Sequence, residues 1–437
     1  MGRKLGMKRR LNSDSAIADE PAGAEAERIG RLAENPALQE ACGRLRTLEP
    51  WIEQQQMELT AVAAPTHFEG LRAEWMLRQW RALGWEAELD AVGNVIASQP
   101  GAQPRGPALA LTAHLDTAFA PGTPVRPERR NGRLYAPGIC DNGAGLAALL
   151  ALARTVREQR LALPAPLLLV ANVGEEGEGD LKGMRHLFRR ESAYAARIGW
   201  TVVLDGPGTE HITAEALPSR RLRLVLEGPG GHSWSDLGRA SALHAAVRVG
   251  AALLAQVEPQ AERLGCNLGW MQGGSAVNAI AAGAQLKLDL RAREPAAVEV
   301  LTRAVRRALA AGVGQENAAA LSGRVRGRME VIGERPGGAL APDAPLLQLV
   351  RAVDRQLGIE AQVQCASTDA NLPISQGRQA LRLGAGGHGG GVHTLQEWFD
   401  PTGRSRALER VLWLAMALQA LPAPTRRRRR PPPAPAP

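Results

Sequence analysis

Aromatic residues, cysteines and long apolar runs are scarce in this sequence of 437 residues. Aromatic residues make up 3% of the chain and hydrophobic residues 45%, so its core must be built mainly from alanine, leucine, valine and isoleucine. Four cysteines lie far apart without a Cys-x-x-Cys pair, which indicates reduced thiols in a cytoplasmic protein rather than a disulfide framework. No apolar run reaches about 18 residues, and polar and small residues follow the basic N-terminus, so we expect neither a membrane span nor a signal peptide.

The net charge of +9 comes from the two ends of the chain. Five basic residues lie between Arg3 and Arg10 and five arginines lie at 426–430; without these ten, 43 basic residues face 44 acidic ones. A basic stripe on a folded surface would predict nucleic-acid binding, whereas charged tails are typically solvated. We therefore expect no nucleic-acid or membrane partner, and disordered tails at residues 1–30 and 425–437.

The order of apolar segments predicts two domains, as the length of the chain also suggests. Strand-like and helical patterns alternate from residue 108 to residue 204, which is typical of an α/β protein. Residues 217–332 instead read strand, helix, two strands, helix and strand, the order of a ferredoxin-like sandwich. The first alternation resumes after Pro336. We expect a discontinuous catalytic domain formed by residues 31–216 and 333–424, and an inserted α+β domain formed by residues 217–332.

Five motifs place histidines or acids at junctions between strands and loops. Their candidate residues are His114, Asp141, the pair Glu175 and Glu176, Asp205 and His393. Each motif alone also fits an ordinary turn or helix cap. Together they form the nitrogen and oxygen ligand set that zinc prefers, and ligands usually bind at the carboxyl ends of strands in α/β sheets. The sequence therefore predicts one metal-binding site.

The order of the motifs resembles that of one enzyme family. The chain contains His-x-Asp at 114–116, Gly-x-x-Asp-Asn-Gly at 138–143, Glu-Glu-Gly at 175–177, Leu-Asp-Gly at 204–206, Gly-Gly-His-Ser at 230–233 and Gly-x-x-His-Thr at 390–394. This order is similar to the di-zinc exopeptidase and deacylase family of peptidase T, carboxypeptidase G, aminoacylase, acetylornithine deacetylase and succinyl-diaminopimelate desuccinylase, and it covers roughly residues 35–420. The resemblance implies a mixed-sheet, phosphorylase/hydrolase-like catalytic domain with an inserted ferredoxin-like lid and dimerisation domain.

The resemblance also implies how metals are held. Asp141 would bridge two divalent metal ions. Zinc is the expected metal, and cobalt and manganese are the alternatives. His114 and Asp205 would complete one site, and Glu176 and His393 the other.

Catalytic roles follow from the same resemblance. Glu175 would be the general base: two cations lower the pKa of a bridging water, and Glu175 takes its proton and returns it to the leaving nitrogen. Asp116 would orient His114 through the second ring nitrogen. His232 would stabilise the developing oxyanion, often in the site of the partner subunit, so a homodimer through the inserted domain is expected.

Substrate binding is assigned to Arg291 and Asn278, which match positions that hold a substrate carboxylate in some relatives; an exposed arginine at a strand end would look the same. Asp205 stands where many deacylases of the family have glutamate, and Asn142 stands where many members have a second acid. Both resemble the peptidase T-like branch. We therefore predict a cytoplasmic metallopeptidase, an exopeptidase of small peptides.

Other functions stay open at this point. An N-acyl amino acid deacylase or a carboxypeptidase of the same family is the first alternative. A binding protein that kept the fold without catalysis is the second, although Glu175 and all five ligands are present. A nucleic-acid binder acting through its arginine tails is the third.

Overall fold

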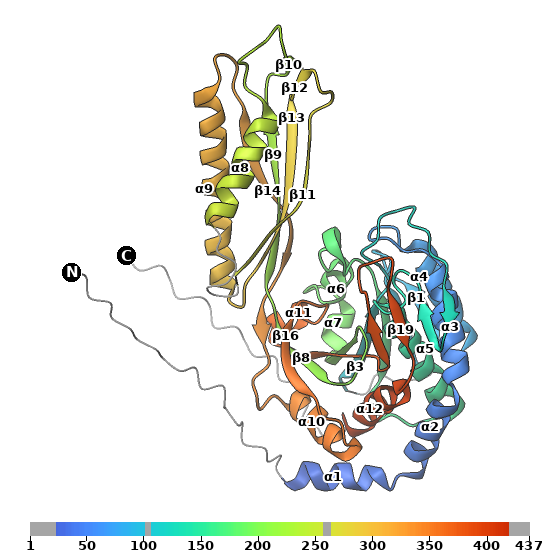
Figure 1. Ribbon diagram of the computed structural model, residues 1–437. Helices are drawn as coiled ribbons and strands as arrows, with labels where there is room; N and C mark the ends of the chain where they lie inside the picture. The colour runs from blue at the N-terminus through green and yellow to red at the C-terminus, as the bar shows by residue number, and fades with distance from the viewer. Residues whose placement is uncertain (1–22, 101–105, 257–263, 419–437) are drawn as a thin grey trace, which may run out of the picture.

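A mixed sheet of nine strands forms the centre of the larger part of the molecule (Figure 1). The computed structural model describes residues 23–100, 106–256 and 264–418. The strand order is β1-β2-β6-β3-β7-β17-β8-β15, with β16 beside β8. The strands are β1 (Glu86–Leu89), β2 (Val95–Ser98), β3 (Ala108–His114), β6 (Leu167–Asn172), β7 (Ile198–Leu204), β8 (His211–Ala216), β15 (Gly338–Ala339), β16 (Gln362–Ala366) and β17 (Gln379–Leu383).

The central strands of this sheet run parallel. Strand β3 pairs in parallel with β6 on one side and with β7 on the other, and β7 pairs in parallel with β17. Their carboxyl ends therefore meet at one edge of the sheet, which is where α/β proteins usually bind ligands. Antiparallel pairs join β1 to β2 and β2 to β6, so the sheet is mixed, as predicted.

Helices cover both faces of the sheet because successive strand side chains point in opposite directions. Leu109 and Leu111 of β3 pack into the large core that includes helix α5, whereas Ala108 and Ala110 pack into a smaller core that includes α6. The helices of this part are α1 (Gly23–Ala33), α2 (Pro36–Thr47), α3 (Glu49–Ala61), α4 (Gly70–Ala82), α5 (Gly143–Glu158), α6 (Lys182–Leu187), α7 (Ala193–Arg197), α10 (Pro345–Leu357), α11 (Asn371–Ser375) and α12 (Arg404–Ala417).

The inserted segment forms a second sheet with two helices on it. The chain runs β9 (Ser219–Glu227), α8 (Ala242–Gln256), β11 (Gly265–Gly273), β13 (Gly283–Arg291), α9 (Pro295–Ala319) and β14 (Arg326–Arg335). The antiparallel sheet has the order β11-β13-β9-β14, so the first and third strands of the segment lie in the centre. Leucines of β9 and β13 pack against α8 and α9. This arrangement confirms the predicted ferredoxin-like sandwich and, with the mixed sheet, the predicted fold class.

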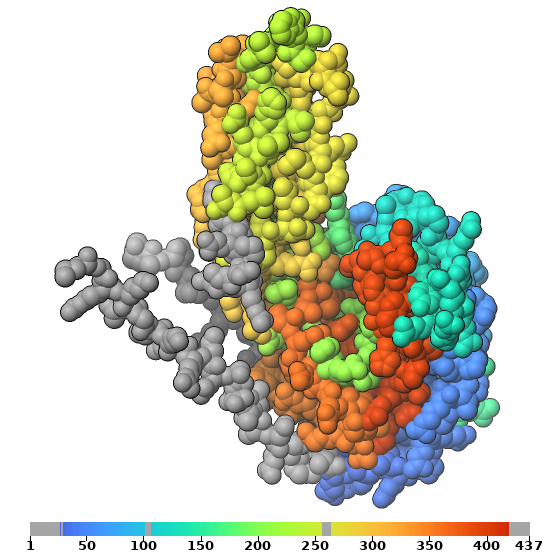
Figure 2. Space-filling view, in the orientation of Figure 1, coloured from blue at the N-terminus to red at the C-terminus, as the bar shows by residue number. Residues whose placement is uncertain are grey.

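The insert stands away from the larger part and joins it at one end (Figures 1 and 2). A short pair of strands, β10 (Gly231–His232) and β12 (Ala279–Ile280), lies at the far tip. Figure 2 shows a notch between the insert and the larger part. Strand β14 continues to Arg335, three residues beyond the predicted boundary at 332.

A small antiparallel sheet lies beside the larger part of the molecule. Its order is β18-β19-β5-β4, and its strands are β4 (Glu128–Arg130), β5 (Arg133–Tyr135), β18 (His388–Gly390) and β19 (Trp398–Asp400). It joins the segment before Asp141 to the segment around His393, since β5 pairs with β19.

The predicted tails lie mainly outside the described residues. Residues 425–437 are outside them, but the predicted N-terminal tail, residues 1–30, overlaps helix α1, which begins at Gly23. Buried Ile29 and half-buried Leu32 pack against the large core, so apolar burial orders this part of the chain. Among the described residues, no helix combines the length and the apolar character that crossing a membrane requires.

Candidate metal centre

Three neighbouring strands deliver most of the predicted ligands. Strand β3 ends at His114, the loop after β6 carries Glu175 and Glu176, and Asp205 directly follows β7. Because β6, β3 and β7 are adjacent and parallel, these side chains leave the sheet at the same edge. The sequence pattern of acids and histidines after buried strands thus leads to one place in the fold.

The fourth ligand segment is the turn before α5. Asn142 is the N-cap of this helix: its Oδ1 accepts from the N–H of Gly145 at 3.0 Å, and its Nδ2 donates to the carbonyl of Leu204 at 2.9 Å. The peptide bond between Asp141 and Asn142 is cis. Asn142 therefore fastens the Asp141 turn to the end of β7, next to Asp205.

Asp141 faces two groups of ligands through its two carboxylate oxygens. Its Oδ1 lies 3.0 Å from Nε2 of His114, and the same nitrogen lies 3.9 Å from Oδ1 of Asp205. Its Oδ2 lies 3.2 Å from Nε2 of His393, which lies 2.8 Å from Oε1 of Glu176. Within each group of three, the ligand atoms lie within 4.8 Å of one another. The structure thus brings all five predicted ligands together, with Asp141 between the two groups.

The other two residues with predicted roles at this site lie beside the ligands. Glu175 is buried, and one of its oxygens lies within 4.8 Å of ligand atoms of His114 and Glu176. Asp116 accepts the N–H groups of Glu175 and Glu176 at 2.9 and 2.8 Å and the hydroxyl of Thr66 at 3.0 Å. Nδ1 of His114 lies 2.9 Å from the main-chain oxygen of Asp116 and 3.6 Å from its carboxylate. In this structure the Asp116 carboxylate therefore contacts the Glu175 loop more closely than the ring.

The concentration of acids shifts the pKa values of the two histidines. Hydrogen bonds to Asp141 and Glu176 raise the pKa of His393 to about 10. Burial alone would lower the pKa of His114, but interactions with Asp116 and Asp141 outweigh it and hold this pKa well above its usual range. Burial raises the pKa of Glu176 to about 7, although the hydrogen bond to His393 opposes this. Bound cations would displace the histidine protons and neutralise the acids.

The donor set fits divalent metal ions. Two imidazoles and several carboxylates supply nitrogen and oxygen atoms. Borderline metals such as zinc bind such a mixed set, whereas calcium and magnesium prefer ligand sets made of oxygen alone. Like charges at such distances destabilise one another unless positive charge lies between them. The geometry therefore supports metal binding at the edge of the sheet where the ligands converge.

Two predicted residues lie far from this cluster in the fold. His232 and Asn278 are exposed at the tip of the insert, where Asn278 accepts the N–H of Ser233 through its main-chain oxygen. The structure therefore does not bring them to the ligands of their own chain (Figure 1). Arg291 ends β13 at the base of the insert, and its Nε lies 2.6 Å from Oδ2 of Asp289. Their predicted roles stay predictions.

Sequence reasoning missed a buried glutamate that supports the Asp141 turn. Glu397 accepts the N–H groups of Gly138 at 2.8 Å, Cys140 at 2.9 Å and Asp141 at 2.8 Å. Glu397 follows His393 by four residues, so its side chain connects the segment of His393 to the segment of Asp141. The only signal in the sequence was an acid shortly after His393, which looks like any surface residue.

A second residue with a supporting role is Asn371, at the start of α11. Its Nδ2 donates to the main-chain oxygens of Leu217 and Pro336, at 2.9 and 3.0 Å. These residues lie in the two chain segments that enter and leave the insert. Asn371 therefore anchors the two connections between the insert and the larger part of the molecule. These contacts join positions that are too far apart in the sequence to be predicted from a local pattern.

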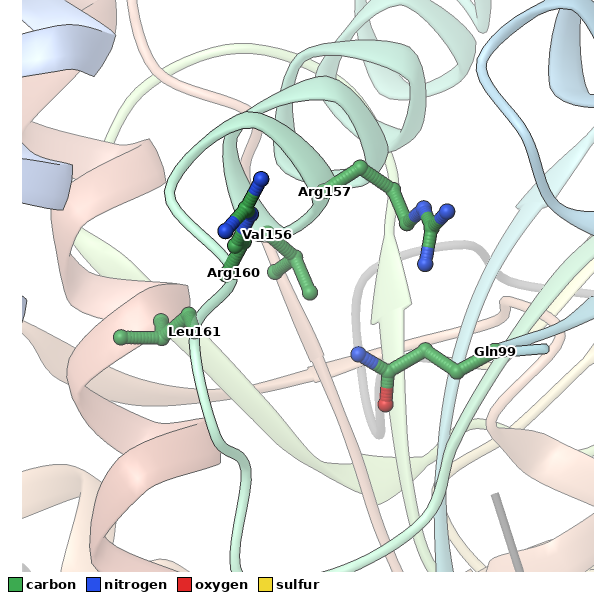
Figure 3. A pocket seen from close by; sticks show the side chains of 5 residues that line it. All are labelled: Gln99, Val156, Arg157, Arg160 and Leu161. Carbon is green, nitrogen blue, oxygen red and sulfur yellow. The ribbon is translucent and has the colours of Figure 1, made fainter. Parts of the chain in front are cut away.

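A separate hollow lies at the carboxyl end of α5 (Figure 3). Gln99, Val156, Arg157, Arg160 and Leu161 line it, and the side chains of Gln99 and Arg157 extend into it. These five residues include no acid and no histidine. The hollow therefore differs from the ligand cluster in place and in chemistry.

Comparisons with known proteins identify relatives of this chain. The cytosol non-specific dipeptidase of Escherichia coli (strain K12) is 26% identical over 251 residues, 51% of this chain and 50% of that protein. A Pyrococcus furiosus protein named as a LysW-lysine/LysW-ornithine hydrolase is 40% identical over 90 residues, 20% of this chain and 26% of that protein. The chain thus matches half or less of the length of these curated relatives.

A solved structure shares the fold. The aminopeptidase PepT of Bacillus cereus ATCC 10987 has a TM-score of 0.63 and 19% sequence identity, over 85% of this chain and 99% of that chain. The model of peptidase family M20/M25/M40 matches residues 110–415, which include all five predicted ligands and the whole insert. Because this match takes in more than half of the chain, the protein belongs to the peptidase family M20/M25/M40, whose members act on peptide or amide bonds.

Proposed function

We propose that the protein is a peptidase of small peptides that works with two divalent metal ions, with zinc as the metal we expect. The observation that carries this proposal is the position of Asp141, whose two carboxylate oxygens face two separate pairs of ligands. A single metal would need one group of ligands, and here two groups share one carboxylate. The names of a dipeptidase relative and of an aminopeptidase of the same fold support a peptide substrate.

The chain supplies the groups that a hydrolysis of this kind needs. When bound, the metals would polarise the substrate carbonyl and make water a better nucleophile at neutral pH. Glu175 accepts the proton of the attacking water and donates it to the leaving nitrogen, because its carboxylate lies beside the ligands without being one of the five. The strand ends and Asp116 hold Glu175 and the ligands in one frame.

The place of His232 supports a role for a second copy of the chain. His232 lies at the tip of the insert, away from the ligands of its own chain (Figure 1). We propose that the insert, residues 217–332, forms the dimer contact and presents His232 to the partner's site. The larger unit, residues 31–216 and 333–424, then holds the metals, and the enzyme works in the cytoplasm.

The substrate test uses the purified protein loaded in turn with zinc, cobalt or manganese. Di- and tripeptides and N-acyl amino acids are offered as a mixture, and their loss is followed by mass spectrometry. We expect metal-dependent loss of peptides with a free amine, and no loss with Glu175→Gln. Cleavage of the acylated compounds alone would instead make the protein a deacylase, the alternative that the hydrolase name of the Pyrococcus furiosus relative favours.

A further inference from the structure

Glu175, the proposed proton carrier, has one charged partner that its motif did not suggest. Nη1 of Arg335 donates to Oε1 of Glu175 at 2.7 Å, and Nη2 donates to the main-chain oxygen of the same residue. Both side chains are buried, with 4% and 8% of their surface exposed. Nη1 also lies 3.3 Å from the hydroxyl of Ser367. One guanidinium therefore fixes both the side chain and the main chain of Glu175.

Arg335 is itself held at a fixed point of the fold. It is the last residue of β14 and lies opposite Ser219 of β9, at the base of the insert. The next residue, Pro336, is bound through its carbonyl by Asn371 of the larger part. Asn371 also binds the carbonyl of Leu217, in the segment that leads into the insert. The two connections beside Arg335 are therefore held by the same side chain.

The rest of the Glu175 loop is held by the same end of the insert. Arg221 of β9 donates to the carbonyl of Gly177, and Nζ of Lys287 in β13 lies 2.5 Å from Oε1 of Glu178. From the opposite side, Asp116 accepts the N–H groups of Glu175 and Glu176. The loop is therefore clamped between the end of β3 and the base of the insert.

We propose that Arg335 is a positioning residue for Glu175: it fixes the direction of this carboxylate relative to the metal ligands. A glutamate side chain has several rotatable bonds, and Arg335 limits them because one nitrogen holds the carboxylate while another holds the main-chain oxygen of the same residue. A shift of about 1 Å in a reacting group can cost about 100-fold in rate. The inference rests on the proposed function of Glu175 in proton transfer.

The competing role for Arg335 is recognition of a substrate carboxylate. A guanidinium that bound substrate would act on affinity, so its loss would raise KM for substrates with a free carboxylate. A guanidinium that only positions Glu175 acts on the chemical step. The two roles are therefore separated by how the loss divides between kcat and KM.

The experiment compares Arg335→Met and Arg335→Lys with a control on the same strand, Arg328→Met. Arg328 lies in exposed ion pairs with Glu227 and Glu330, and it stands opposite Val225 on β9, whereas Arg335 stands opposite Ser219. We expect Arg335→Met to lower kcat by about 10- to 100-fold, with KM within about twofold of the wild-type value. Arg335→Lys keeps the charge but reaches fewer acceptors, so it should retain more of kcat than Arg335→Met. Arg328→Met should leave both constants unchanged.

A second measurement does not depend on turnover. Hydrogen exchange of the peptide covering residues 174–181, followed by mass spectrometry in the zinc-loaded protein, reports whether the loop is held. We expect faster exchange in Arg335→Met and wild-type exchange in Arg328→Met, with equal zinc content in all variants.

The outcomes separate the two proposals. A rise in KM with unchanged kcat, or unchanged exchange and unchanged kcat in Arg335→Met, would overturn the positioning role. If the wild-type protein hydrolyses none of the offered compounds, the proposed function fails, whereas the exchange data still decide whether Arg335 holds the Glu175 loop.

Discussion

The substitution Glu397→Gln tests whether the Asp141 turn depends on a buried carboxylate. Glu397 accepts three main-chain N–H groups, those of Cys140 and Asp141 through Oε1 and that of Gly138 through Oε2. Glutamine has one carbonyl oxygen and one amide nitrogen. If its oxygen keeps the first two donors, its amide faces the N–H of Gly138, and two donors then point at each other.

The size of the effect follows from these contacts. A hydrogen bond to a charged group contributes about 1.5–3 kcal/mol, and a buried donor left without a partner costs a similar amount. Burial also raises the pKa of Glu397, because the charged form is costly to bury, and glutamine avoids that cost. We therefore expect a net loss of about 1–3 kcal/mol in the free energy of unfolding, which corresponds to about 1–4 °C in melting temperature for a chain of this size.

The same substitution should weaken metal binding, because Asp141 lies in both groups of ligands. Loss of a group that orients a metal ligand typically costs about 10- to 100-fold in affinity. Melting temperature is measured by differential scanning fluorimetry without metal, and affinity by competition with a zinc chelator. The control is Glu409→Gln on α12. It removes the negative charge that pairs with Arg46 of α2, away from the Asp141 turn. Equal metal affinities in the two variants would refute the reasoning.

Three further predictions concern the ligand cluster. Glu175→Gln should lower kcat by at least about 100-fold while metal content, measured by elemental analysis, stays that of the wild type. Asn142→Asp should lower the melting temperature, because an ionised carboxylate cannot donate to the carbonyl of Leu204; a wild-type melting curve would argue against this contact. In the metal-free protein, the pKa of His393 is raised to about 10, so its contribution to stability is complete below the unfolded-state pKa of about 6.5 and is lost as the pH rises towards 10. Zinc must displace that proton, so the rise in melting temperature on adding zinc should grow from about pH 6 to about pH 9; a gain independent of pH would contradict this assignment.

The two parts of the chain were predictable because each has its own order of strand-like and helical segments. Apolar strands alternating with helices indicate a sheet with helices on both faces, and the order of segments in 217–332 indicates the ferredoxin-like sandwich. The start of the ordered chain was less predictable. Helix α1 lies in a segment rich in charged and small residues, and it is ordered by a few apolar contacts to a core that the segment itself does not reveal.

Residue types and motifs alone predicted the candidate metal ligands His114, Asp141, Glu176, Asp205 and His393. Three of them, His114, Glu176 and Asp205, stand at or just after the ends of adjacent parallel strands. Parallel pairing of adjacent strands then brings such junctions to one edge. Which oxygen of Asp141 faces which ligands, and which residues support the site, depends on how distant segments pack together. Glu397 and Arg335 reach it from positions more than 150 residues from their partners. Pairings over such distances depend on how the whole chain packs, so no local pattern carries them.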